Sequence, residues 1–156
     1  MRLFSSTLLL SVFFAAPARA QTAGDAWEFG LGPQVVYRES SSSTHFGGGV
    51  TVARRLGRFA AVLEGSGTRR QGHNDWRVIG GPRLAFGAGA RSAYFAHVLA
   101  GSLIRQKTAG WAVLPGVGFE ARVGDTHAVR LQIDAPIEHT QDRTVNSVRA
   151  SVWFVF

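Results

Sequence analysis

The 156-residue sequence contains no cysteine and a single lysine, and no stretch beyond residue 20 is apolar for the length of a membrane helix. Without cysteine there are no disulfides and no thiolate metal sites. A membrane helix needs about 20 apolar residues, so any membrane span must be built from strands. An exported domain without disulfides must be held together by its core or by a closed hydrogen-bond ladder between strands.

The first twenty residues have the pattern of a cleavable signal peptide. Arg2 supplies the positive start, an apolar run follows at 8–14, and Ala18-Arg19-Ala20 is a small-x-small processing site. We therefore expect a signal peptide at 1–20, Sec-type export with cleavage, and one mature domain at 21–156. The alternative for this segment is a buried N-terminal helix.

The formal net charge is +7, and nearly all of the positive charge is arginine. A basic balance can indicate nucleic-acid binding, which needs a basic surface that faces phosphates. Here single arginines are spread along extended segments between Glu and Asp, which indicates internal ion pairs. We expect no nucleic acid, cofactor or metal as a partner, because there is no metal-ligand spacing and the glycine clusters fit no phosphate-binding loop.

The last ten residues show the pattern that recurs along the chain. Val148, Ala150, Val152, Phe154 and Phe156 fall on one face of an extended strand, and polar residues fall on the other. A period of two predicts a strand with one face in an apolar medium.

The same alternation predicts eight strands, at 27–38, 46–52, 59–68, 76–86, 94–104, 111–122, 129–137 and 147–156. Longer polar loops are expected after the first, third, fifth and seventh strands, and short turns after the others. The expected fold class is all-β, an eight-stranded antiparallel up-and-down transmembrane β-barrel.

Aromatic side chains are predicted to form two bands on the apolar face, as at the two interfaces of a membrane. The periplasmic band comprises Trp27, Phe59, Phe86, Tyr94, Phe154 and Phe156, and the external band comprises Tyr37, Phe46, Trp76 and Trp111. The alternative is a soluble sandwich or barrel with these aromatics in its core.

The polar face mixes small residues with charges of both signs, and His97 is expected to point to this side. Eight strands enclose a space just wide enough for side chains, where an unpaired charge is costly. We therefore expect a lumen plugged by a salt-bridge ladder of Glu28, Arg38, Glu64, Arg77, Arg83, Glu120, Arg122, Arg130, Asp134 and Arg149. Four prolines fall inside the predicted strands, with β-bulges as the expected accommodation: Pro33, Pro82, Pro115 and Pro136.

Together these features resemble the small outer-membrane barrels of the OmpA/OmpX type, in the porin-like superfamily. The segments that carry the resemblance are Gly80-Gly81-Pro82-Arg83-Leu84, 95–101 and 148–156. The resemblance implies a Gram-negative outer membrane, contact with its lipids as a monomer, and assembly by the barrel-assembly machinery. The assembly signal would be Val152, Phe154 and Phe156. No substrate is implied, because one fold hosts many functions.

The function expected from the sequence is a structural or surface-interaction role without catalysis. A basic rim that could meet lipopolysaccharide phosphates is predicted at Arg69, Arg70, Arg105, Lys107 and Arg143. One alternative is a soluble periplasmic ligand-binding barrel of the lipocalin-like type. The less favoured alternative, a lipid A-modifying barrel enzyme, resembles a serine hydrolase with His and Ser two residues apart, and the sequence has no His-x-Ser.

Overall fold

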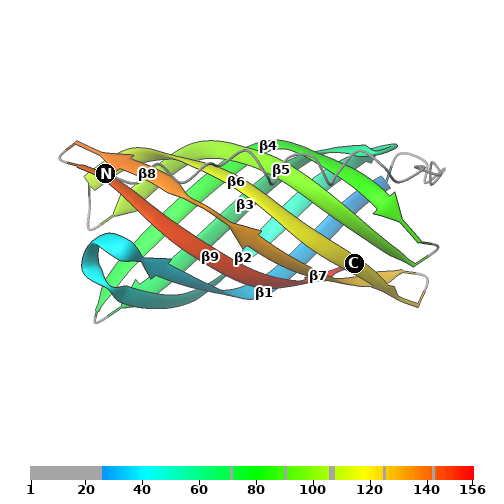
Figure 1. Cartoon of the computed structure of the whole chain (residues 1–156), viewed down its shortest axis with the longest axis horizontal. Coiled ribbons are helices and arrows are strands. Elements are labelled where there is room, and N and C mark those ends of the chain that lie inside the picture. Colours follow the sequence, from blue (N-terminus) through cyan, green and yellow to red (C-terminus); the bar gives the residue numbers. More distant parts are fainter. Residues whose placement is uncertain (1–25, 71, 90, 106–107, 125, 142) are drawn as a thin grey trace, which may run out of the picture.

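The structure, a computed structural model, describes residues 26–70, 72–89, 91–105, 108–124, 126–141 and 143–156. The predicted signal peptide at 1–20 lies outside the described residues. Consecutive antiparallel strands pair along the chain (Figure 1): β1 (Ala26–Arg38), β2 (Ser43–Leu56), β3 (Phe59–Arg70), β4 (His73–Ala88), β5 (Ser92–Arg105), β6 (Thr108–Val123), β7 (His127–Asp134), β8 (Ile137–Thr140) and β9 (Arg143–Val155). One 3-10 turn, η1 (Glu39–Ser41), connects β1 to β2. No helix in the described ranges is long and apolar enough to cross a membrane.

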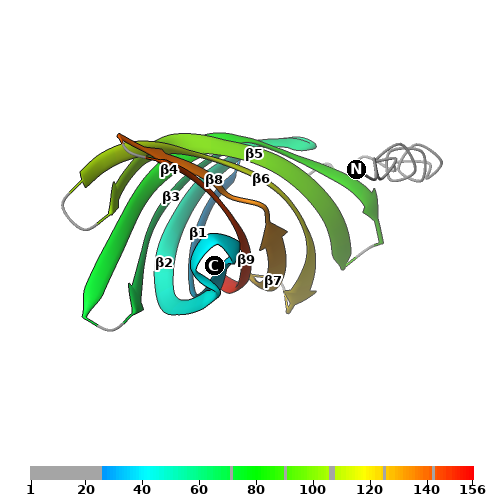
Figure 2. The same cartoon turned by 60° about the vertical axis from the view of Figure 1, so that its left-hand side comes forward.

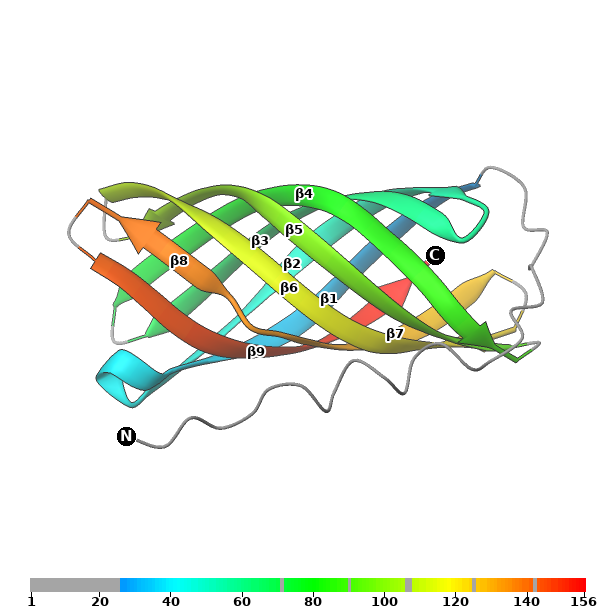
Figure 3. The ribbon, with the colours of Figure 1, turned by 45° about the horizontal axis from the view of Figure 1, so that its top comes forward.

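The sheet closes on itself because β9 pairs with β1. Figure 2 shows β4, β5 and β6 arching over one side of the barrel, with β1, β9 and β7 opposite. β7 and β8 are two parts of one strand, since both lie between β6 and β9 and keep one register across the interruption at Ala135 and Pro136 (Figure 3). The assigned strands therefore form a ring of eight, and the predicted antiparallel up-and-down transmembrane barrel is confirmed.

The stagger of the strands sets their tilt. A path that starts at Ala26 of β1 and passes to each residue's partner on the next strand returns to β1 at Val36, ten positions farther along. The partners on this path are Arg55, Ala60, Arg83, His97, Gly116, Asp134 and Arg149. Ten positions correspond to about 33 Å along a strand, and eight strand spacings correspond to about 38 Å around the ring. Their ratio gives strands that are tilted by about 41° from the barrel axis. Membrane barrels of this size have such a tilt.

The barrel has a turn end and a loop end. The turn end carries the start of β1, the end of β9 and the connections after β2, β4 and β6, whereas the loop end carries the connections after β1, β3, β5 and β8. The prediction of longer loops at one end is wrong, because the loop-end connections are only two to four residues long. The polar segment 70–75, for example, continues a hairpin in which Arg69 pairs with Asn74. Beyond the apolar belt a strand can be polar on both faces, because its outer face meets water and lipid headgroups.

The prolines interrupt pairing without shifting it. The β1–β9 register is the same on both sides of Pro33, and the β4–β5 register is the same on both sides of Pro82. Pro136 lies between β7 and β8, where its carbonyl accepts a hydrogen bond from the Ser147 amide (3.0 Å). Bulges predicted at these prolines are therefore wrong: the loss of one donor at each ring nitrogen does not require an extra residue in the strand.

The two faces of the wall have the predicted polarity. Within the described part of the chain, 23 polar or charged residues are buried against 13 hydrophobic ones, the reverse of a soluble domain. Large apolar side chains are exposed on the outer wall, for example Phe29 (56%), Leu63 (56%) and Ile133 (59%). Most of the large aliphatic and aromatic side chains thus face outward.

The interior also contains apolar side chains that the alternation did not assign. One wall of the lumen carries a cluster of Ile79, Leu99, Leu103, Ala112 and Leu114. Trp153 lies buried in a second cluster with Ala128 and Val155. In β5, where both faces are apolar in the sequence, Phe95, His97 and Leu99 point inward. The lumen therefore pairs an apolar wall with layers of charge.

Candidate functional site

The lumen holds three groups of polar residues, which we name by their position along the barrel. The turn-end cluster consists of Glu28, Arg55, Arg83, Glu120 and Arg130. The central cluster consists of Gln34, Glu64, His97, Gln132, Asp134 and Arg149. The loop-end cluster consists of Arg38, Asp75, Arg77, Arg105 and Glu138. The three clusters together contain seven arginines and six carboxylates, so their charges nearly cancel. Such pairing is needed because an unpaired charge that is removed from bulk water is costly.

Two glutamates share three arginines in the turn-end cluster. Glu28 Oε2 accepts hydrogen bonds from Arg83 Nη2 (2.5 Å) and Arg130 Nη2 (2.9 Å). Glu120 Oε2 accepts from Arg130 Nε (2.9 Å), and Glu120 Oε1 accepts from Arg55 Nη2 (3.0 Å). Arg55 also pairs with Glu28. These side chains come from β1, β2, β4, β6 and β7, so the cluster ties together strands on different sides of the lumen.

Phe95 connects the turn-end cluster to the central one. Its ring lies 5.7 Å from Arg83 Cζ and 5.5 Å from Arg130 Cζ, distances at which a guanidinium is attracted to an aromatic ring. On its other side the ring stacks on His97, with centroids 5.9 Å apart. An aromatic residue here fills volume and also contacts the cations.

Arg149 is the centre of the central cluster and is fully buried. Its Nε donates to Asp134 Oδ2 (2.7 Å), its Nη2 donates to Glu64 Oε2 (3.2 Å), and its Nη1 donates to Glu64 Oε1 and to Gln34 Oε1 (3.2 Å). Asp134 Oδ1 accepts a hydrogen bond from His97 Nε2 at 2.6 Å. One guanidinium thus joins carboxylates from β3 and β7 across the lumen.

Gly116 makes room for the central cluster. A Cβ at this position would overlap the Asp134 carboxylate and the His97 ring. Glycine is required here because two side chains pass directly over the backbone of β6.

Glu138 and Asp75 hold the loop-end cluster. Arg38 Nη2 lies 2.5 Å from Asp75 Oδ2 and 3.5 Å from Glu138 Oε2, and Arg105 pairs with Glu138. Arg77 Nε lies 2.9 Å from Glu138 Oε1, an ion contact without the alignment of a hydrogen bond. Glu138 is completely buried and forms ion pairs with all three arginines of this cluster.

Arg122 is the member of the predicted salt-bridge ladder that joins none of the three clusters. It is half-buried at the turn end and forms no ion pair with any residue that the structure describes. The other predicted members all lie in the lumen within the clusters.

Sequence reasoning missed four charged members: Arg55, Asp75, Arg105 and Glu138. Each follows the inward parity of its strand, as Asp75 does two positions before Arg77, but Arg55, Asp75 and Arg105 lie in stretches read as turns or loops, and Glu138 lies one position beyond the predicted strand at 129–137. Extending the alternation through polar segments would have found them. Arg105 points into the lumen, so its inclusion in the predicted basic rim is wrong. Two other members of that rim, Arg69 and Arg143, are exposed. Lys107 and the side chain of Arg70 lie outside the described residues.

The predicted aromatic bands lie on the outer wall. Exposed side chains at the turn end are Trp27, Phe59, Tyr94, Phe154 and Phe156, with Phe86 half-buried beside them. Exposed side chains toward the loop end are Tyr37, Phe46, Trp76 and Trp111. Of the predicted assembly signal, Phe154 and Phe156 are exposed and Val152 is half-buried, all on the outward face. Among the described residues, no group of three or more His, Cys, Asp or Glu is placed to hold a metal ion.

A scan against protein-family models finds no match, and a search of curated proteins finds none either. Solved structures match in fold. Neisserial surface protein A (NspA) aligns with a TM-score of 0.69 at 8% identity, over 85% of this chain and 97% of that one. The N-terminal β-barrel domain of Pseudomonas aeruginosa OprF aligns with a TM-score of 0.51 at 12% identity, over 85% of this chain and 100% of the domain. Ail, the attachment invasion locus protein of Yersinia pestis, aligns with a TM-score of 0.52 at 11% identity, over 85% and 97%.

Proposed function

We propose that this chain, which has the fold of the small eight-stranded outer-membrane β-barrels, serves in the outer membrane as a structural barrel with a plugged lumen. The observation that carries this proposal is the stack of three ion-pair clusters along the lumen. A cavity enclosed between the turn-end and central clusters has a volume of about 10 Å³ and is lined by Glu64, Arg83 and His97 among others. That is about the space of one water molecule, which is too small for a solute path.

A soluble ligand-binding barrel of the lipocalin-like type fits these faces poorly. Such a barrel keeps its apolar side inward around the ligand. Here the outer wall exposes Trp27 (63%), Phe46 (65%) and Val50 (61%), while Glu64 and Arg149 occupy the centre of the lumen. An outer surface of this kind needs an apolar solvent.

A catalytic role is not part of the proposal, although three histidines contact neighbouring hydroxyls: His45 with Ser43 (3.1 Å), His127 with Thr126 (2.8 Å) and His139 with Thr144 (2.9 Å). His97 is buried against Asp134, in the closed middle of the lumen. His139 stacks on Trp111 with centroids 5.2 Å apart, and His127 meets the Phe156 ring edge-on at 5.4 Å. Ser102 follows His97 by five positions in β5 and points to the outer face of the barrel, whereas His97 points into the lumen.

The proposed partners follow from the outer wall. Lipids of the outer membrane would surround the apolar belt, and exposed Arg69 and Arg143 near the loop end could meet lipopolysaccharide phosphates. The outward Val152 and Phe154 of β9, with Phe156 just after its end, would be read by the barrel-assembly machinery during insertion. The barrel would work as a monomer, and the short loop-end connections leave the strand ends themselves as its surface for contacts.

Ion leakage tests the plugged lumen. Purified protein refolded into vesicles that contain a potassium gradient should leak no faster than empty vesicles. The double variant Glu64→Ala/Arg149→Ala removes a matched pair of charges and two of the six members of the central cluster, and it should keep the gel-mobility shift of a folded barrel on boiling. Leakage by the unaltered protein would contradict the proposal, whereas leakage by the double variant alone would show that the central cluster seals the lumen and a tight double variant would show that the turn-end and loop-end clusters are sufficient.

A further inference from the structure

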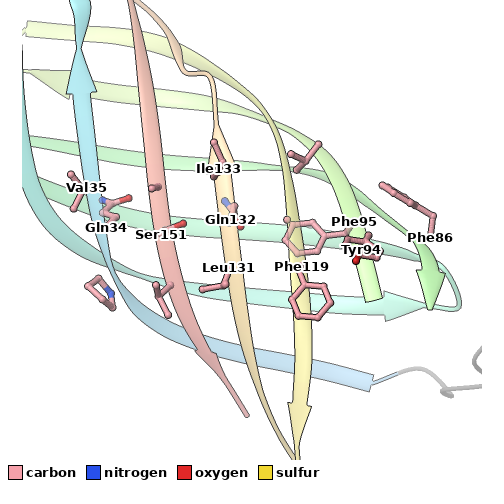
Figure 4. Close-up of a pocket in the computed structure, with 15 residues that line it drawn as sticks. Gln34, Val35, Phe86, Tyr94, Phe95, Phe119, Leu131, Gln132, Ile133 and Ser151 are labelled. Carbon is pink, nitrogen blue, oxygen red and sulfur yellow. The ribbon is translucent and has the colours of Figure 1, made fainter. Parts of the chain in front are cut away.

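A narrow furrow crosses the outer wall from β5 through β6, β7 and β9 to β1, and Phe86 of β4 lines its end beside Tyr94 (Figure 4). Its floor is a row of successive cross-strand partners: Phe95, Gly118, Gln132, Ser151 and Gln34. The four of these residues that have side chains are buried on the lumen side, so the furrow is floored by backbone. Its volume is about 630 Å³.

The two walls of the furrow are apolar. The wall toward the turn end is formed by Tyr94, Phe119, Leu131, Val152 and Pro33, one from each strand. The wall toward the loop end is lower and is formed by Val117, Ile133, Ala150 and Val35. The side chain of Ala150 is the smallest in the two walls, and it lies on β9, the fourth of the five strands that the furrow crosses. The furrow therefore offers hydrocarbon on both sides along its full length.

The dimensions of the furrow match a single linear hydrocarbon chain. Four steps between neighbouring strands give a length of about 19 Å, and the backbones of the two wall rows, which are two positions apart along each strand, are about 6.6 Å apart. One leaflet of the bilayer contributes about 15 Å of hydrocarbon, which is the length of one acyl chain. A helix with its side chains, about 10 Å across, is too wide. The broad convex wall of a second barrel would not fill the furrow either.

The ends of the furrow indicate the leaflet from which such a chain would come. Tyr94, at one end, is the third residue of β5 from the turn end and lies in the aromatic band. Its ring packs against Phe119, with centroids 5.3 Å apart. Tyr is favoured where hydrocarbon meets headgroups, because its ring is apolar and its hydroxyl is polar. From there the furrow climbs with the stagger of the strands to Val35 in the loop-end half of β1.

We propose that this furrow is a binding site for one acyl chain of a phospholipid whose headgroup lies in the turn-end leaflet beside Tyr94. The contact is more extensive than that of ordinary surrounding lipid, because the chain would touch a floor and two walls. Phospholipid bound here would stay with the barrel when bulk lipid is removed. The inference rests on the membrane placement proposed above, and the test separates the two.

The experiment compares lipid retention by two matched variants. Ala150→Phe puts a ring into the furrow at β9, whereas Ala61→Phe puts the same ring on the exposed outer face of β3, away from the furrow. Unaltered protein and both variants are refolded into vesicles of palmitoyl-oleoyl phosphatidylethanolamine and phosphatidylglycerol, extracted into detergent, and weighed by native mass spectrometry. We expect one retained phospholipid on the unaltered protein and on Ala61→Phe. For Ala150→Phe the lipid-bound fraction should fall by about tenfold.

The possible outcomes separate the site from the membrane placement. If all three proteins insert and show the heat-dependent mobility shift, but retain lipid equally or not at all, the furrow site is refuted and the membrane barrel stands. If Ala61→Phe loses lipid as much as Ala150→Phe, the retained lipid is not held in the furrow and the site is refuted as well. If the unaltered protein stays soluble and does not insert, both proposals fall.

Discussion

Replacement of Arg149 by methionine should strongly destabilise the barrel. In the folded protein this guanidinium is fully buried, donates to both Glu64 and Asp134, and shares no contact with bulk water. Methionine keeps much of the side-chain volume and removes the charge. Two carboxylates would then remain in the lumen without their cation.

The two carboxylates would not be affected equally. Asp134 keeps the hydrogen bonds from His97 (2.6 Å) and Gln132 (3.1 Å). Glu64 has its hydrogen bonds to Arg149 and would be left buried without this partner. Breaking one buried ion pair in this way costs about 3–5 kcal/mol, and we expect a loss of about 4 kcal/mol in the free energy of unfolding. Removal of both charges in Glu64→Gln/Arg149→Met should cost only about 1–2 kcal/mol.

The assay is equilibrium unfolding by urea from phospholipid vesicles, followed by tryptophan fluorescence and by the mobility of unboiled samples. The unaltered protein, both single variants and the double variant form a double-mutant cycle, in which the coupling energy should reach about 2 kcal/mol or more. Unchanged slopes with urea concentration would show that the midpoint shifts report stability. The reasoning is refuted if Arg149→Met unfolds within about 1 kcal/mol of the unaltered protein, or if the double variant is as unstable as Arg149→Met.

Three further outcomes are expected. Gly116→Ala should lose about 1–3 kcal/mol in the same unfolding assay, because its methyl group would overlap the central cluster. The control Gly65→Ala, whose methyl group would meet only Val50 at 3.8 Å, should stay within about 0.5 kcal/mol of the unaltered protein. Equal losses in the two variants would count against the crowding argument. Brominated phospholipids should barely quench the tryptophan fluorescence of a variant that keeps only the buried Trp153, whereas the fluorescence of Trp153→Phe should be quenched like that of the unaltered protein. Strong quenching of Trp153 would place its side chain on the lipid face and not in the lumen. Asp134→Ala should cost less than Arg149→Met, about 1–3 kcal/mol, since Glu64 still neutralises Arg149; a larger loss would show that the His97 contact dominates.

Alternation of side chains was sufficient to predict the barrel. A period of two distinguishes the lipid face from the lumen because these two environments differ so sharply in polarity, and Trp27 and Glu28 already show the contrast. The strand number followed from the count of such segments. The inward orientation of His97 followed from the same parity.

Sequence reasoning failed where polarity and secondary structure are no longer linked. Asp75 and Arg105 lie at the loop end, where both faces of a strand can be polar, so their segments looked like loops. Phe95 and Trp153 show the converse, since the parity of their strands places them in the lumen although their side chains are apolar. Which carboxylate meets which arginine depends on the stagger around the ring, and a single sequence does not specify that stagger.

The furrow was also beyond sequence reasoning. Its floor joins five residues that are neighbours only through the register of β5, β6, β7, β9 and β1, and its depth comes from the modest size of side chains such as Ala150. Nothing in the order of the residues along one strand indicates a groove that runs across strands.

The ion pairs of the lumen connect positions that are far apart in the chain. Arg130 and Glu28 are separated by 102 residues, and Arg149 and Glu64 by 85. A partly assembled sheet with β1 to β4 in place would pair Glu28 with Arg55 and Arg83 but would hold Glu64 without Arg149 of β9, so one face of that open sheet would present this unpaired charge to the membrane. Ionised side chains exposed to hydrocarbon are strongly disfavoured. Insertion and closure of this barrel should therefore occur as one concerted event, with the last strand supplying the countercharge that lets the first ones leave water.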